Sequence, residues 1–235
     1  MISSARSNHG FTLIELMLAM TFISVLLVAV AMTTIYMSRT YSRGVSIKEV
    51  NQAGRDVSDY LRRDVIAARP VGNYFVAADA SGAAGLGRFC LGEFSYVWNP
   101  AAALNSDTFV KYTDTEQPIV FARVKDSQGA LCTATGGVYP VAILRSNATA
   151  LIESDNYNLA VHDFKATRLN DSGAITGNFL YKVEFVLGTN EKDTINEGAI
   201  GTMDQRCKSP NEKTSNIEFC SINKFETVYY SGGAA

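Results

Sequence analysis

The sequence contains few of the side chains that most often carry catalysis or bind metals. It has 2 histidines and 4 cysteines among 235 residues, and no two cysteines have the spacing C-x-x-C. His9 and His162 lie far from every cysteine along the chain, so we predict no zinc site. The G-x-S-x-G, H-E-x-x-H and Walker A motifs and a catalytic pair of acids are also missing. We therefore predict no enzymatic activity and no cofactor.

Neither sign of charge dominates the chain. The 21 lysines and arginines nearly balance the 23 aspartates and glutamates, which leaves a net charge of −2. A broadly basic surface that would bind nucleic acid is therefore not expected, although a local basic patch stays open. The mean hydropathy of +0.03 agrees with one apolar span joined to a water-exposed part.

Charge is missing altogether from one stretch near the beginning of the sequence. Between Leu16 and Tyr36 there is no charged residue, no glycine and no proline. About 21 such residues at ~1.5 Å per residue give ~31 Å of helix, which matches the apolar core of a bilayer. The stretch therefore predicts a transmembrane helix, and Glu15 stands at its start. A carboxylate inside a span costs roughly 2.5–3.5 kcal/mol and usually has a partner and a function.

The residues at the start of this run resemble a known processing site. The segment Gly10–Glu15, with the sequence GFTLIE, is similar to the signal of type IV prepilins and pseudopilins. The resemblance implies that prepilin peptidase cuts after Gly10 and methylates the new amine on Phe11. It also implies that Glu15 meets the amino-terminal amine of a neighbouring subunit during assembly. The alternative is a plain membrane anchor in which Glu15 lies at the headgroups and has no function.

The resemblance divides the chain into three parts. Residues 1–10 are a cleaved leader, residues 11–69 are a long stem helix whose first part (11–36) spans the membrane, and residues 70–235 form a β-rich head. Apolar residues at three- or four-residue steps predict that the second half of the stem is amphipathic. These residues are Val50, Ala53, Val57, Leu61, Val65 and Ala68.

Short β-like runs alternate with turn residues through the head, whereas residues 70–89 read as a loop. The resemblance to pilins makes this loop a candidate contact surface, and the alternative, which we favour, is a plain flexible connector. The predicted strands are Phe89–Trp98, Phe109–Tyr112, Ile119–Val124, Val138–Arg145, Ala160–Leu169, Phe179–Leu187 and Phe225–Tyr230. Antiparallel strands packed on one long helix make a pilin-like α+β fold, because the helix stripe and a sheet face bury each other.

A second resemblance points to a minor subunit. The segment Asp59–Val65 is similar to the corresponding segment of J-type minor pseudopilins and W-type minor pilins. It implies a place at or near a filament tip and a role in adhesion, twitching motility or pilus initiation. The expected partners are other pilin subunits, prepilin peptidase, the inner membrane before assembly, and a host-cell or surface receptor. A minor pseudopilin of type II secretion and a DNA-uptake (competence) pilin stay open as alternatives.

The expected location follows from the same resemblance. The precursor would lie in the cytoplasmic membrane with its amino end inside, and the assembled subunit would lie in an extracellular pilus or a periplasmic filament. The four cysteines would then be outside the cytoplasm, where disulfides persist. They allow three pairings. We favour Cys90 with Cys132 and Cys207 with Cys220, and the Cys207–Cys220 loop resembles the disulfide-bounded region of many pilins.

Three further residue sets have weaker signals. Asp193, Glu197 and Asp204 could offer oxygens to calcium, but their spacing matches no EF-hand, so a solvated loop and no metal are expected. Trp98 is expected in the core, with a carbohydrate platform as the alternative. His162 is expected to be a packed or surface residue rather than a ligand.

Overall fold

The computed structural model describes residues 10, 12–68, 74–77, 87–104, 110–127, 129–136, 139–140, 143–153, 158–169, 179–190, 194–196, 198, 202–209 and 220–231. The chain divides into two compact units, Met1–Ser42 and Arg43–Ala235, and the boundary falls within helix α1 (Leu13–Ala67). Because α1 is followed by antiparallel strands, the fold is α+β and pilin-like, as the sequence predicts.

The first unit presents the apolar part of α1. An 18-residue window of this helix has a mean hydropathy of 2.5, and none of that window is buried. The hydroxyls within it bond to carbonyls of the preceding turn; for example, Ser24 donates to Met20 O over 2.8 Å and Thr33 to Ala29 O over 2.8 Å. Such internal bonds let a polar side chain lie in an apolar setting without an unsatisfied donor.

The second unit contains the amphipathic part of α1, and the predicted stripe is its buried face. The buried helix residues are Val50, Gly54, Val57, Leu61 and Val65, and Ala68 just beyond the helix is also buried. Ala53 is only half-buried. Spacings of three and four residues keep these positions on one side of a helix, which explains why a single stripe suffices to attach it.

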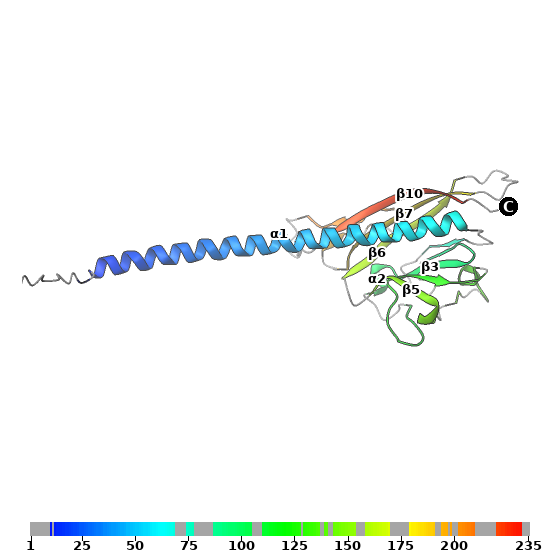
Figure 1. Ribbon diagram of the computed structural model, residues 1–235, viewed down its shortest axis with the longest axis horizontal. Helices are drawn as coiled ribbons and strands as arrows, with labels where there is room; N and C mark the ends of the chain where they lie inside the picture. Colours follow the sequence, from blue (N-terminus) through cyan, green and yellow to red (C-terminus); the bar gives the residue numbers. More distant parts are fainter. Residues whose placement is uncertain are drawn as a thin grey trace, which may run out of the picture. The chain divides into compact units, whose positions relative to one another are not determined.

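A three-stranded antiparallel sheet lies beside this part of α1, with strand order β10 (Ile222–Ser231), β7 (Phe179–Thr189) and β6 (Leu159–Arg168). Figure 1 shows β10 running along the helix. A Cβ added at Gly54 would lie 2.0 Å from the Phe225 ring, so the glycine permits close contact between helix and strand. Tyr229 donates to Ser58 O over 3.1 Å.

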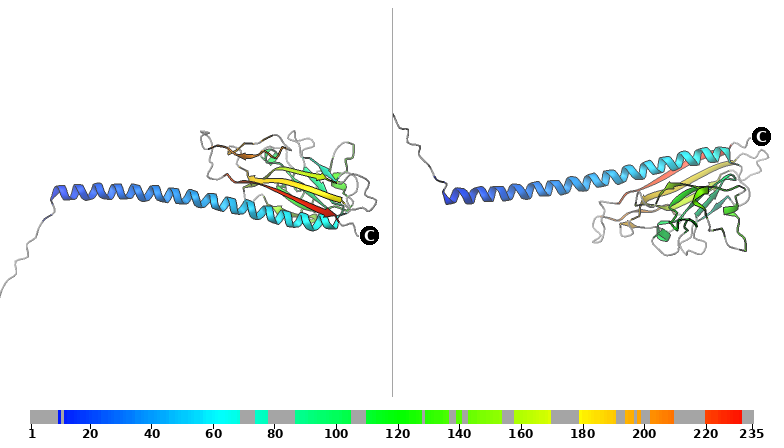
Figure 2. Two further views of the ribbon diagram at one scale, coloured as in Figure 1. Left: turned by 90° about the horizontal axis from the view of Figure 1, so that it is seen from above. Right: turned by 60° about the horizontal axis from the view of Figure 1, so that its bottom comes forward.

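The second sheet has five antiparallel strands in sequence order. They are β1 (Phe75–Val76), β2 (Gly87–Cys90), β3 (Phe94–Trp98), β4 (Phe121–Lys125) and β5 (Ala148–Ile152). Successive residues face opposite sides: Trp98 and Phe121 join the core shared with α1 and the three-stranded sheet, whereas Val97 and Ala122 join a second core. Both faces are therefore buried. Figure 2 shows the two sheets of this unit from further directions.

Aromatic rings hold the two sheets together in the shared core. The ring centroids of Trp98 and Phe164 lie 4.3 Å apart, and those of Phe121 and Phe164 lie 6.0 Å apart. Trp98 is 1% exposed, so it is a core residue and not a carbohydrate platform. Large buried rings of this kind contribute most of the apolar area in a core.

Asp64 fastens the last turns of α1 to the five-stranded sheet. Arg123 donates to its carboxylate from Nε over 2.5 Å and from Nη2 over 2.8 Å, and the Tyr96 hydroxyl donates over 2.6 Å. Burial and the bond to Asp64 raise the pKa of Tyr96 well above its usual value, and the same carboxylate raises the pKa of Arg123. Two hydrogen bonds therefore join Arg123 to Asp64 within the ion pair, and a third from Tyr96 holds the Asp64 carboxylate.

Smaller elements complete the head. Helix α2 (Ala101–Leu104) and the 3₁₀ turns η1 (Ala130–Cys132) and η2 (Arg145–Asn147) connect strands, and β8 (Ile195–Asn196) pairs with β9 (Arg206–Cys207). Disulfides join Cys90 to Cys132 and Cys207 to Cys220, which is the pairing favoured from sequence.

Several predicted strands differ from those observed. The run Phe89–Trp98 is not one strand but the hairpin β2–β3, which turns at Gly92 with φ 98°. Of the predicted strand Phe109–Tyr112, the described residues 110–112 form only bridges, because Lys111 pairs with Pro118 and Tyr112 with Ile143. Of the strand predicted at Val138–Arg145, the described residues 139–140 and 143–145 contain only a bridge at Ile143 and the start of a 3₁₀ turn at Arg145, and strand β5 follows that turn. Strand β1 lies within the predicted loop 70–89.

Candidate functional site at the start of helix α1

The start of α1 is closed by a reciprocal pair of side chains. The Glu15 carboxylate accepts from Thr12 N over 2.9 Å and from the Thr12 hydroxyl over 2.8 Å. In return, Glu15 N donates to Thr12 Oγ1 over 3.3 Å. This is the capping box, in which a threonine and a glutamate three residues later satisfy amide groups that the first turn leaves unpaired. Within the isolated chain, the carboxylate is thus held by its own helix.

Glu15 shares one face of the helix with apolar side chains. Together with Ile14, Leu18, Ala19 and Phe22 it lines a shallow depression on the exposed surface of α1. These positions recur at steps of three and four residues, so they form one stripe. The small side chain of Ala19 leaves space for the depression, and Glu15 forms part of its lining. An apolar group and a cation from another molecule could therefore be received side by side.

The two processing residues lie just before this cap. Gly10 is exposed, and a Cβ added to it would meet no atom within 4 Å. Phe11 lies outside the described residues. The predicted cleavage after Gly10 and methylation on Phe11 therefore stay predictions, as does the pairing of Glu15 with a neighbour's amine.

Comparison with known proteins bears on this segment. The family model described as the prokaryotic N-terminal methylation motif matches residues 5–34. No curated protein and no solved structure matches the chain. The fold is α+β and pilin-like, with antiparallel sheets that follow one long helix whose first part is apolar. Its amino-terminal segment carries the methylation motif that is the signature of type IV pilins and pseudopilins.

The motif has three consequences for the chain as a whole. It points to a structural subunit rather than an enzyme. It implies processing by prepilin peptidase and assembly with other pilin subunits. Together with the exposed apolar part of α1, it fits a membrane-anchored precursor that enters a filament.

The other residues singled out from sequence do not gather at this site. Asp193 and Glu197 lie outside the described residues, Asp204 is exposed, and no cluster of three metal-binding side chains occurs in the described part of the chain. His162 is 3% exposed, and its Nε2 lies 3.0 Å from Thr189 O. It is therefore a packed residue, one of the two readings that the sequence allowed.

Sequence reasoning did not identify Thr12 as the partner of Glu15. The signal was present, because a threonine followed three residues later by a glutamate and an apolar run is the sequence pattern of a capping box. The Asp64–Arg123 pair was also missed. Its partners are 59 residues apart, and no local pattern joins them.

Proposed function

We propose that the chain is a minor subunit of a bacterial type IV pilus. The precursor lies in the cytoplasmic membrane with its amino end inside, is cut after Gly10, is methylated on Phe11, and enters the filament through α1. The observation that carries this proposal is the methylation motif over residues 5–34. The exposed apolar helix that begins within it supplies the surface for assembly.

Glu15 sets the register of the stem. A carboxylate and a free amine are both costly in an apolar filament core, and pairing between neighbours offsets part of the desolvation of each. The depression beside Glu15 would take the neighbour's Phe11 ring while the carboxylate takes its amine. Assembly would replace the two hydrogen bonds from Thr12 with a cationic partner, which adds a Coulombic attraction that the neutral donors of Thr12 do not supply.

The head provides the exposed part of the subunit. It has its own core and two disulfides, which suit a place outside the cytoplasm. A large, self-contained head fits a filament tip, where no subunit stacks above it. The head would there serve adhesion, motility or the initiation of assembly.

The intact mass of the protein in sheared filaments tests this proposal. We expect a chain that begins at Phe11, carries one added methyl group, and has all four thiols oxidised. A protein that keeps Met1 and never fractionates with filaments would refute it. Deletion of the gene then separates the alternatives: loss of surface pili and twitching supports the proposal, whereas loss of protein secretion or of DNA uptake alone would assign the chain to those systems.

Two substitutions separate the charge of Glu15 from its capping role. Glutamine also serves in a capping box, so Glu15→Gln keeps the helix start and removes only the charge. Thr12→Ala removes the capping hydroxyl and keeps the charge, at a cost of about 1 kcal/mol to the helix. We expect Glu15→Gln to be absent from filaments and Thr12→Ala to be incorporated. The reverse result would show that the cap, and not the charge, is required.

A further inference from the structure

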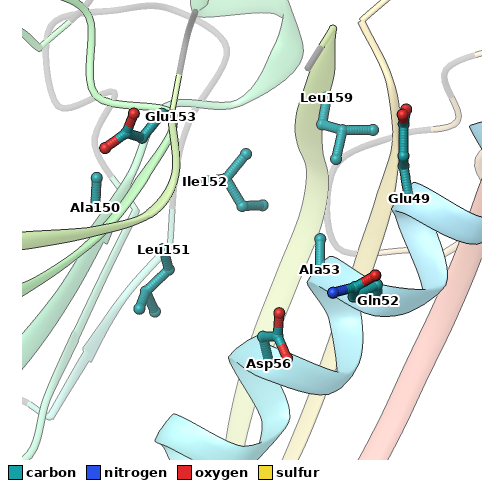
Figure 3. A pocket seen from close by; sticks show the side chains of 9 residues that line it. All are labelled: Glu49, Gln52, Ala53, Asp56, Ala150, Leu151, Ile152, Glu153 and Leu159. Carbon is teal, nitrogen blue, oxygen red and sulfur yellow. The ribbon is translucent and has the colours of Figure 1, made fainter. Parts of the chain in front are cut away.

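A groove in the second unit lies between α1 and strand β5. It has a volume of about 310 Å³ and is lined by nine residues. The helix contributes Glu49, Gln52, Ala53 and Asp56, the strand side contributes Ala150, Leu151, Ile152 and Glu153, and β6 contributes Leu159. Figure 3 shows the helix on one side, β5 on the other, and Leu159 between them. An adjoining depression continues the groove along the helix past Asp59 to Arg63.

The groove is apolar at its base and acidic on its walls. Alanines, leucines and an isoleucine provide the apolar surface, and none of the nine lining residues is basic. Glu49 and Asp56 come from the helix, whereas Glu153 comes from the strand side, and Figure 3 shows its carboxylate directed away from the helix. Glu153 lies 3.9 Å from Arg145, whereas Glu49 and Asp56 form no ion pair within the described part of the chain. Glu49 and Asp56 lie about two helical turns apart along the helix wall, which suits an elongated cationic occupant rather than a single metal ion.

Two sheet edges flank the same groove. Among the described strands, β5 pairs only with β4 and is the last strand of its sheet; β6 is the last strand of the three-stranded sheet, and its Val161 forms an isolated bridge to Pro100. An edge strand offers backbone groups to a segment from another chain. The groove therefore combines an apolar base, acidic residues and the edge strand β5, which together define a protein-docking surface.

We propose that this groove binds a lysine- or arginine-bearing segment of a different pilin-like subunit. The inference rests on the proposed function, because a filament supplies the neighbour and a minor subunit meets subunits other than itself. The charge of the occupant follows from the walls. Covering Glu49 and Asp56 would cost several kcal/mol of desolvation per ion unless each carboxylate gained a cationic partner. Acidic walls also attract a basic segment over a Debye length of about 10 Å at 0.1 M salt.

Photocrosslinking within assembled filaments tests the inference. A photoreactive phenylalanine analogue replaces Gln52 at the mouth of the groove, and in the control it replaces Val228, which is 51% exposed on the three-stranded sheet. We expect the Gln52 probe to form an adduct with a different subunit that carries the methylation motif. We expect the Val228 probe not to form that adduct. An adduct with a second copy only, with a protein that is not pilin-like, or with nothing, would overturn the inference.

Charge reversal gives the second readout. Glu49→Lys combined with Asp56→Lys should lower the Gln52 adduct about tenfold, and Glu153→Lys on the opposite wall should lower it in the same direction. Exposed Glu93, outside the groove, provides the matched control Glu93→Lys, which should leave the adduct unchanged. Replacing a basic residue of the captured segment with glutamate should restore the adduct in the reversed variant. A yield of the Gln52 adduct that stays the same in all of these variants would overturn the inference.

Filament fractionation is measured in the same cells. A wild-type chain that never reaches filaments refutes the proposed function itself. A chain that reaches filaments but gives no charge-dependent adduct from Gln52 refutes only the groove inference.

Discussion

The two parts of helix α1 share one backbone geometry but have opposite relations to the rest of the chain. Up to Ser42 no described residue of the first unit is buried, and large apolar side chains such as Leu27 are 60% exposed. In the second unit, Val57 and Leu61 are completely buried against both sheets. The comparison shows that one part of the helix is buried against its own head, whereas the other presents exposed apolar surface, which fits cover by a membrane or by neighbouring subunits.

Removal of leucine side chains should give the largest difference between the two parts. Leu61→Ala should lower the free energy of unfolding of the head by about 2–5 kcal/mol, because it leaves a cavity in the core. Leu27→Ala should leave head stability unchanged and reduce filament incorporation. Denaturant unfolding of the detergent-solubilised protein and filament fractionation measure the two effects. Equal losses of stability in both variants would contradict the comparison.

The second largest effect should come from removing the Asp64 carboxylate, which attaches the second part of α1 to the five-stranded sheet. Asp64→Asn replaces an acceptor of three hydrogen bonds with an amide that turns a donor toward Arg123, and we expect a loss of about 1.5–3 kcal/mol. Exposed Asp59 lies on the same helix and provides the control, for which Asp59→Asn should change stability by less than about 0.5 kcal/mol. Thermal unfolding compares the pair, and a similar effect at both sites would show that Asp64 does not fasten the helix.

The two glycines of the second part should respond in opposite directions. Gly54→Ala places a methyl group against the Phe225 ring and should cost about 1–3 kcal/mol. A Cβ at Gly44 meets nothing within 4 Å, so Gly44→Ala should stabilise the helix by up to about 1 kcal/mol. Pairing Gly54→Ala with Phe225→Leu should recover part of the loss. If Gly54→Ala were also stabilising, the close approach of β10 would be wrong.

Lowering the pH should produce the smallest of these effects, a loss of stability of the head. Hydrogen bonds from Lys224 and Lys182 hold the pKa of Glu184 below its usual value of 4.5. Because the folded pKa is the lower one, this carboxylate stabilises the head above about pH 4.5, and its contribution is lost as pH falls through the folded value. The melting temperature of Glu184→Gln should therefore depend less on pH below 4.5 than that of the wild type. If the melting temperatures of the variant and the wild type changed equally with pH, this role of Glu184 would be excluded.

Local periodicity accounts for the parts of the fold that the sequence predicts well. The apolar run and the stripe through Val57 and Leu61 require only a helical repeat, and α1 ends at Ala67, close to the expected end. The β2–β3 hairpin was missed because apolar residues precede Gly92 and resume at Phe94, so the run reads as one strand. Strand β5 has the sequence ATALI, and its two alanines give little β signal.

The two candidate sites also differ in whether a local sequence pattern identifies them. Glu15 could be identified from the motif alone, because motif and site occupy one short segment. The groove could not, since it joins helix residues near Asp56 to strand residues near Ala150. Contacts at such separation depend on how the two sheets pack, and no pattern within a short window specifies that packing.

Ser231 is the last residue of β10. Its hydroxyl donates a hydrogen bond to the carbonyl oxygen of Ala68, just after the end of α1, over 2.9 Å. The two residues are 163 positions apart, so the contact forms only after β10 has been synthesised. A nascent chain would carry the stripe around Leu61 uncovered until β10 had emerged and docked. A chain that lacks β10 would thus expose this apolar stripe and would be a substrate for quality-control proteases.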